Sequence, residues 1–168
     1  MSFIDTIKKN KHRSEVNKDL HSGEVYDLWS HLVSRYDVLK KTQIFYSFAH
    51  DIEFKLMIKK GLEILEGQIE ELEQIMIKYG LVLPDRPPAA PPTTNNLPLF
   101  TDEMIYKEIL NAIGQFIDTH VRTFRFMWND DLRPLFIKYI KMELDIYDKW
   151  MKYGKLKGWI NIPPSSQL

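Results

Sequence analysis

A proline-rich stretch in the middle of the chain, residues 80–100, most constrains the fold, because no helix can run through GLVLPDRPPAAPPTTNNLPLF. Both of its flanks carry helical patterns. A helix over 51–79 is roughly 42 Å long at about 1.5 Å per residue, and an extended linker of about twenty residues spans at most about 60 Å. A loop between adjacent antiparallel helices needs only about 2–8 residues. The stretch therefore predicts a crossover along a helical bundle, with parallel helices before and after it.

Two apolar stripes precede this stretch and predict helices over 22–49 and 51–79. In each stripe apolar residues recur at spacings of three and four, which is typical of one buried helix face. The first stripe consists of Val25, Leu28, Trp29, Leu32, Tyr36, Leu39, Gln43 and Tyr46, and the second of Ile58, Leu62, Leu65, Ile69, Leu72, Met76 and Tyr79.

Several residues mark the ends of these helices. Ser22 is the expected N-cap of the first helix, and Gly80 suits the position after the last residue of the second. Gly61 and Gly67 interrupt the second stripe, and because glycine destabilises a helix interior they predict a close helix contact or a bend. Thr101 is the expected cap of the helix that follows the proline-rich stretch.

The second half of the chain predicts helices over 101–128 and 131–153. The sequence IKYG at 77–80 has a counterpart in MKYG at 151–154, so we expect the last helix to end at Gly154. The two similar endings are weak evidence for an internal duplication. Three apolar residues of the segment 154–164 are expected to dock this tail on the bundle: Trp159, Ile160 and Ile162. The inward stripes are Ile105, Ile109, Ile113, Phe116, Ile117, His120, Phe124 and Met127, then Phe136, Tyr139, Ile140, Glu143, Tyr147, Trp150 and Met151.

The composition favours one soluble domain over 22–164, because 44% of the 168 residues are hydrophobic and only 7 are glycine. The formal net charge is zero, so no overall positive field attracts nucleic acid. The sequence has no run of about 18 apolar residues, so we expect no membrane insertion. Cysteine is absent, which suits a cytoplasmic protein. Residues 1–21 have few apolar positions after Ile7 and predict a flexible basic arm, whose basic residues are Lys8, Lys9, Lys11, His12, Arg13 and Lys18.

Five short motifs are spread over 22–164: EVYDLWSHL, GQIEELEQ, YGLVLPDRPPAAPP, LFTDEMI and KGWINIPP. In these motifs the chain resembles a ferritin-like family of unknown function from endospore-forming bacteria, which is distantly similar to spore coat protein F. The resemblance implies an all-α four-helix bundle of two helical hairpins with a long crossover. It implies no activity and no catalytic residues.

Bundles of this kind often hold two metal ions on glutamates and Glu-x-x-His motifs, but none of the five histidines here has a glutamate three residues before it. Counting helical rise places His31, His120 and Glu143 at similar heights. Two interpretations stay open for them. The favoured one is a buried histidine hydrogen-bonded to Glu143 or to a tyrosine, so that no metal or other cofactor is expected. The alternative is a mononuclear or degraded site for a divalent metal.

No Gly-x-Ser-x-Gly, cysteine or phosphate-binding glycine loop is present, so we expect a protein that is not an enzyme. The four tryptophans and eight tyrosines fall at helical spacing or in the tail, and any that stay exposed mark an assembly surface. The expected role is therefore structural and connected with sporulation or the spore coat. The expected partners are a second copy of the chain, as a homodimer, or other spore proteins.

Overall fold

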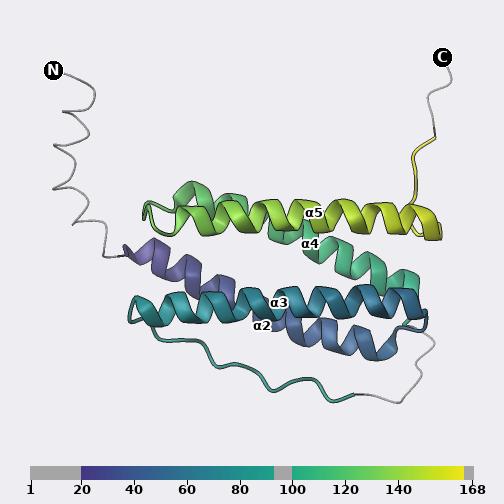
Figure 1. The fold of residues 1–168 in the computed structure, drawn as a ribbon, viewed down its shortest axis with the longest axis horizontal. Helices are drawn as coiled ribbons and strands as arrows, with labels where there is room; N and C mark the ends of the chain where they lie inside the picture. Colours follow the sequence, from purple (N-terminus) through teal and green to yellow (C-terminus); the bar gives the residue numbers. More distant parts are fainter. Residues whose placement is uncertain (1–19, 93–99, 165–168) are drawn as a thin grey trace.

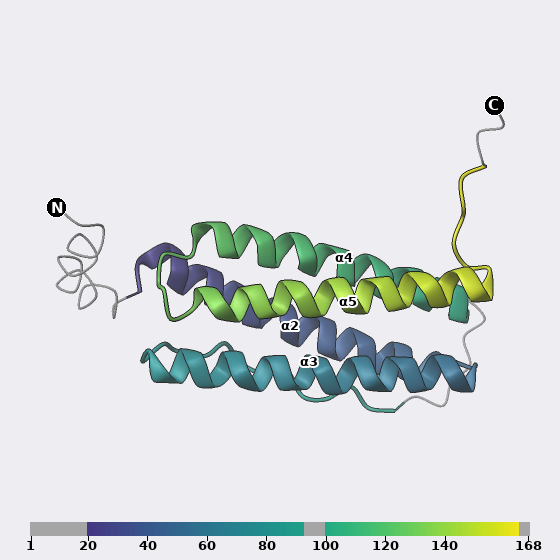
Figure 2. The same ribbon diagram turned by 45° about the horizontal axis from the view of Figure 1, so that its top comes forward.

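The computed structural model describes residues 20–92 and 100–164. Within them it contains four long helices and no strand, which confirms the predicted all-α four-helix bundle. They are α2 (Ser22–Phe48), α3 (Ile52–Lys78), α4 (Asp102–Phe126) and α5 (Arg133–Lys157). Helices α2 and α3 form one hairpin and α4 and α5 the other, and the hairpins meet chiefly where α2 packs on α4. Figures 1 and 2 show the two hairpins as two layers.

Polar contacts at the two ends of the bundle fix the helix directions. At the beginning of α4, the carboxylate of Asp102 accepts hydrogen bonds from the backbone N–H groups of His50 and Asp51, 2.8 and 2.9 Å away, directly before α3. At the other end, the hydroxyl of Tyr79 donates to Asn129 Oδ1, just beyond the end of α4. Helices α3 and α4 therefore begin at the same end of the bundle and run in the same direction.

Residues 80–92 run along the outside of the first hairpin (Figure 1). Leu81 and Leu83 pack on the core, and farther along the backbone N–H of Ala90 donates to Gln43 Oε1 of α2 at 2.9 Å. The other two expected anchors, Leu97 and Leu99, lie in 93–99, outside the described residues. The complete crossover over 80–100 therefore stays a prediction.

The first described helix begins differently from the prediction. His21, and not Ser22, is the N-cap of α2, because its Nδ1 accepts from the backbone N–H groups of Gly23 and Glu24. Leu20 packs against the core. The expected flexible arm over 1–21 is thus wrong for its last two residues, and residues 1–19 lie outside the described part of the chain.

Only one of the two Lys-Tyr-Gly sequences ends a helix. Gly80 follows the end of α3 with φ of 68°, as predicted. Gly154 lies inside α5, which continues to Lys157 and ends at Gly158 with φ of 73°. A close contact requires glycine at this position inside the helix: a Cβ on Gly154 would lie 2.0 Å from the hydroxyl oxygen of Tyr106 in α4. Helix α4 also ends earlier than predicted, at Phe126, and α5 begins at Arg133.

Apolar side chains form two clusters, one toward each end of the bundle. One is built around Leu32, Leu72 and Phe136, and the other around Phe54, Tyr106 and Trp150. Some residues placed on inward stripes or in the docked tail are instead exposed: Trp29, Tyr46 and Ile162. Trp159 and Ile160 do pack on the second cluster. No close helix contact exists at Gly61 or Gly67, because a Cβ there would meet nothing within 4 Å among the described residues.

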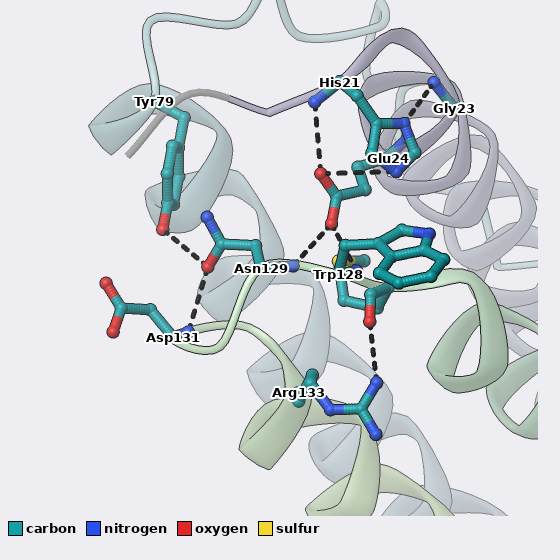
Figure 3. A network of polar contacts seen from close by, with 9 residues as sticks. His21, Gly23, Glu24, Tyr79, Trp128, Asn129, Asp131 and Arg133 are labelled. Atoms are coloured by element: carbon teal, nitrogen blue, oxygen red, sulfur yellow. Dashed lines mark hydrogen bonds and ion pairs between the residues drawn. The ribbon is translucent and has the colours of Figure 1, made fainter. Parts of the chain in front are cut away.

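A buried carboxylate joins the beginning of α2 to the turn between α4 and α5 (Figure 3). Glu24 is 1% exposed, and its Oε1 accepts from the backbone N–H groups of Trp128 and Asn129, each 2.7 Å away. Its Oε2 accepts from the backbone N–H of His21 at 3.1 Å. One carboxylate thus binds a backbone donor directly before α2 and two adjacent donors in the turn after α4.

The variant Glu24→Ala is expected to lower the free energy of unfolding by about 3 kcal/mol, because buried backbone N–H groups lose their acceptor. Urea unfolding followed by circular dichroism measures this. Glu70→Ala, at an exposed position of α3, is the matched control and should change the free energy by less than about 0.5 kcal/mol. Equal effects of the two variants would contradict the proposed role of Glu24.

Candidate functional site

Between the two apolar clusters lies a group of buried polar side chains, here called the central polar cluster. It draws on all four helices, and each member is at most 3% exposed. Its members are His31 and Arg35 of α2, Gln68 of α3, His120 of α4 and Glu143 of α5. His31 and Arg35 are one helical turn apart on the same face, which is why both reach the interior.

Arg35 is at the centre of this cluster. Its Nη2 lies 2.8 Å from Glu143 Oε1 and 2.8 Å from His120 Nε2, and the guanidinium carbon lies 3.8 Å from the centre of the Phe116 ring. Because arginine can only donate, Nη2 of Arg35 is the donor to Glu143 Oε1. One guanidinium therefore joins α2 to both helices of the second hairpin.

The electrostatics follow from burial and this ion pair. Burial alone would raise the pKa of Glu143, but the hydrogen bond of His120 and the charge of Arg35 together hold this pKa below its ordinary value. Burial lowers the pKa of Arg35, and Glu143 opposes that shift. The cluster therefore contains one carboxylate and one guanidinium, whose charges cancel.

His31 stacks on His120 with ring centres 4.7 Å apart. Neither of its ring nitrogens has a hydrogen-bond partner within residues 20–92 and 100–164. Burial, and next the charge of Arg35, lower the pKa of His31 well below its usual range. Burial is also the main reason that the pKa of His120 is lowered. Both imidazoles are therefore neutral at pH 7.

The structure brings together all three residues that the sequence singled out. His120 Nε2 lies 3.5 Å from Glu143 Oε1, and His31 lies against His120. The sequence interpretation did not include Arg35, whose guanidinium lies against both His120 and Glu143. Among the described residues no group of three His, Cys, Asp or Glu side chains is arranged to hold a metal ion.

Arg35 and Gln68 were missed for a common reason. Both are polar, and each directly precedes a predicted stripe position, Tyr36 or Ile69, so the sequence pattern placed them on the solvent-facing side of their helices. A signal for Arg35 was present: it is four residues after His31, and the inward Glu143 needed a partner of opposite charge.

The fold and this buried cluster define a four-helix bundle protein whose interior charges are paired with each other. The chain belongs to the family described as "Protein of unknown function (DUF3231)", whose model matches residues 9–167. It is 24% identical over 155 residues to the uncharacterized protein YvdQ of Bacillus subtilis (strain 168), covering 88% of this chain and 89% of that protein.

A solved structure shares the fold. It is the crystal structure of a protein of Bacillus halodurans C-125 named "putative spore coat protein", with a TM-score of 0.84 and 23% identity. The match covers 89% of this chain and 97% of that chain. Among the four described helices, none combines the length and the apolar character needed to cross a bilayer.

The Arg35–Glu143 pair should behave as a unit. Arg35→Met or Glu143→Leu alone is expected to cost about 3–5 kcal/mol in free energy of unfolding, because each leaves an unpaired charge in the interior. The double variant should be markedly more stable than the sum of the two losses predicts, with a coupling energy of at least about 2 kcal/mol. Urea unfolding of the four proteins measures the coupling, and strict additivity would contradict the pairing.

Acid should destabilise the fold through the histidines. Since the folded pKa values of His31 and His120 lie below the unfolded value of about 6.5, the unfolded chain binds protons first as pH falls. Below about pH 6.5 the free energy of unfolding should fall by up to about 1.4 kcal/mol per pH unit for each histidine. Glu143, with a depressed pKa, adds a loss only at lower pH, below its unfolded pKa of about 4.3.

Unfolding curves of wild type and His31→Phe between pH 7.5 and 5 separate these contributions. The variant should show roughly half the slope, because one titrating group is removed. The matched control is Ser34→Ala, at an exposed position of α2, which leaves both buried histidines in place and should keep the wild-type slope. An unchanged slope in His31→Phe would contradict the assignment.

Proposed function

We propose that this protein is a structural component of the spore that acts through protein contacts, primarily with a second copy of itself, and catalyses no reaction. Two observations support a spore role. The family resemblance carried by the short motifs points to endospore-forming bacteria, and the Bacillus halodurans protein of the same fold is named as a putative spore coat protein. Under this proposal the chain acts in the cytoplasm of the sporulating cell and in the spore that forms there.

The observation that carries the contact role is a group of exposed aromatic side chains, here called the aromatic end: Tyr26, Trp29, Phe126 and Trp128. They are 67%, 43%, 55% and 72% exposed. Two belong to the first turns of α2 and two to the end of α4 and the loop after it. Glu24 bonds directly to the backbone of Trp128, so these two segments are held together (Figure 3). Exposed aromatic groups of this kind are enriched in protein interfaces.

Charge near the aromatic end favours a second copy as the partner. Arg122 and Arg125 lie in the last turns of α4, and Asp130 and Asp131 lie in the turn after it. In a symmetric dimer one patch faces its own copy, so a patch of a single sign would repel itself. Two arginines beside two aspartates permit self-pairing in an antiparallel arrangement.

The interior supports a structural role over a catalytic one. The charged groups of the central polar cluster bond to each other, and His31 and His120 are neutral and sealed between helices. The metal-binding alternative at His31, His120 and Glu143 gains no observation in its favour, because Arg35 already supplies the positive charge beside Glu143.

Size-exclusion chromatography with light scattering at micromolar concentration should give twice the monomer mass. The double variant Trp29→Ser/Trp128→Ser should shift to the monomer mass while its unfolding temperature stays near that of wild type. The matched control is Ile52→Ser/Leu156→Ser, which removes exposed apolar side chains from the opposite end and should remain dimeric.

A strictly monomeric wild type would overturn the dimer. The spore role has its own test, which is detection with an antibody in the coat fraction of purified spores of the bacterium that encodes the chain. Failure to find the protein there or elsewhere in the spore would overturn that part.

A further inference from the structure

A pocket of about 350 Å³ lies between α2 and α4, beside the aromatic end, with which it shares Tyr26. In the described part of the chain, each side chain that lines it carries a hydrogen-bonding group. We propose that this pocket, here called the hydroxyl pocket, binds a neutral monosaccharide of hexose size. The inference goes beyond the proposed function and does not rest on it, because the sugar is recognised within one copy of the chain.

The size of the hydroxyl pocket suits a hexose. A cavity of about 150 Å³ is known to hold benzene, and a hexose has about twice as many non-hydrogen atoms as benzene. The hydroxyl pocket has more than twice that volume. It also falls within the range of about 300–1,000 Å³ that is typical of small-molecule sites. One hexose therefore fits between the two helices.

The hydroxyl groups of the wall call for a ligand that donates hydrogen bonds. Ser30 and Ser34 of α2 donate to the backbone carbonyl groups of Asp27 and Ser30, 3.3 and 2.9 Å away. Thr119 of α4 donates to the carbonyl of Gln115 at 2.8 Å. Each of these hydroxyl protons is already in use, so the three oxygens have only lone pairs to offer. A sugar supplies several O–H donors in a small volume.

His31 is a buried polar group without a partner at this pocket. It lines the pocket and is 1% exposed, and neither ring nitrogen has a hydrogen-bond partner among the residues that the structure describes. The imidazole is neutral, so one nitrogen donates and the other accepts. A sugar hydroxyl can do both and pairs with either nitrogen. Because an unpaired buried polar group is unfavourable, such a ligand removes a cost of the empty pocket.

The charges of the wall select a neutral ligand. Asp27 and Arg122 both line the pocket and bring one negative and one positive charge to it. An anion would be repelled by Asp27 and would face hydroxyl oxygens that can only accept, whereas a cation would be repelled by Arg122. The ring of Tyr26, which is 67% exposed, adds an apolar face for the C–H groups of a sugar.

The test is isothermal titration calorimetry of the full-length protein at pH 7 with glucose, galactose and mannose. At least one hexose should bind with a Kd of about 1 mM or tighter. The uronate and the amino sugar of that hexose keep its ring and add a negative or a positive charge, and each should bind at least about tenfold more weakly. Light scattering of the same samples records the oligomeric state, so a failed dimer and a failed sugar site are distinguished.

Ser30→Ala should weaken hexose binding by about fivefold through loss of an acceptor. The matched control is Ser47→Ala on the same helix: Ser47 is half-buried like Ser30, its hydroxyl also donates to a carbonyl of α2, and it does not line the pocket. That control should bind as wild type does. Circular dichroism checks that each variant is folded.

Asp27→Asn provides a second variant with a readout that a purely structural role would not move. It removes the negative charge from the wall, so the ratio of hexose to uronate affinity should fall at least about threefold. The proposal is overturned if the pocket holds only water and no hexose binds more tightly than about 10 mM. It is also overturned if a charged analogue binds as tightly as the hexose, if Ser30→Ala binds like Ser47→Ala, or if Asp27→Asn keeps the wild-type ratio.

Discussion

The buried ion pair between Arg35 and Glu143 is the interaction on which the rest of the structure depends. Each charge is acceptable in the interior only while the other is within hydrogen-bond reach, since an unpaired buried charge costs several kcal/mol. The pair joins α2 to α5, and Nη2 of Arg35 also reaches His120 of α4. A shift of either hairpin by one turn, about 5.4 Å, would separate the partners. The pair thus fixes the register in which the two hairpins meet, which apolar packing alone specifies less strictly.

At both ends of the bundle a carboxylate of one hairpin accepts backbone hydrogen bonds from the other hairpin. At one end Glu24 accepts backbone N–H groups from the turn between α4 and α5, and at the other Asp102 accepts those of His50 and Asp51. In both cases a carboxylate near the beginning of a helix of one hairpin binds the connecting turn of the other. The turns are therefore held in place from the opposite hairpin, and the apolar clusters fill the space between these ends and the central polar cluster.

The same arrangement explains why the interior is not uniformly packed. A polar layer that needs an arginine, a glutamate and two histidines in fixed positions leaves neighbouring side chains less freedom to fill every gap. A cavity of about 70 Å³ lies at this layer, where Gln68 keeps an amide without described partners. The register of the hairpins is thus specified at some cost in packing.

The sequence by itself determined the four helices, because their apolar stripes and the local end signals at Gly80 and Thr101 depend only on nearby residues. It also placed His31, His120 and Glu143 at one level. Only the tertiary structure showed that Gly154 is needed for a close helix contact inside α5 and not as a helix end, since the neighbour that excludes a Cβ there is Tyr106 on another helix. It likewise decided that Arg35 is buried, because its partner is 108 residues away in the chain. Helix formation follows from local spacing, whereas charge pairing and close approach depend on which faces meet.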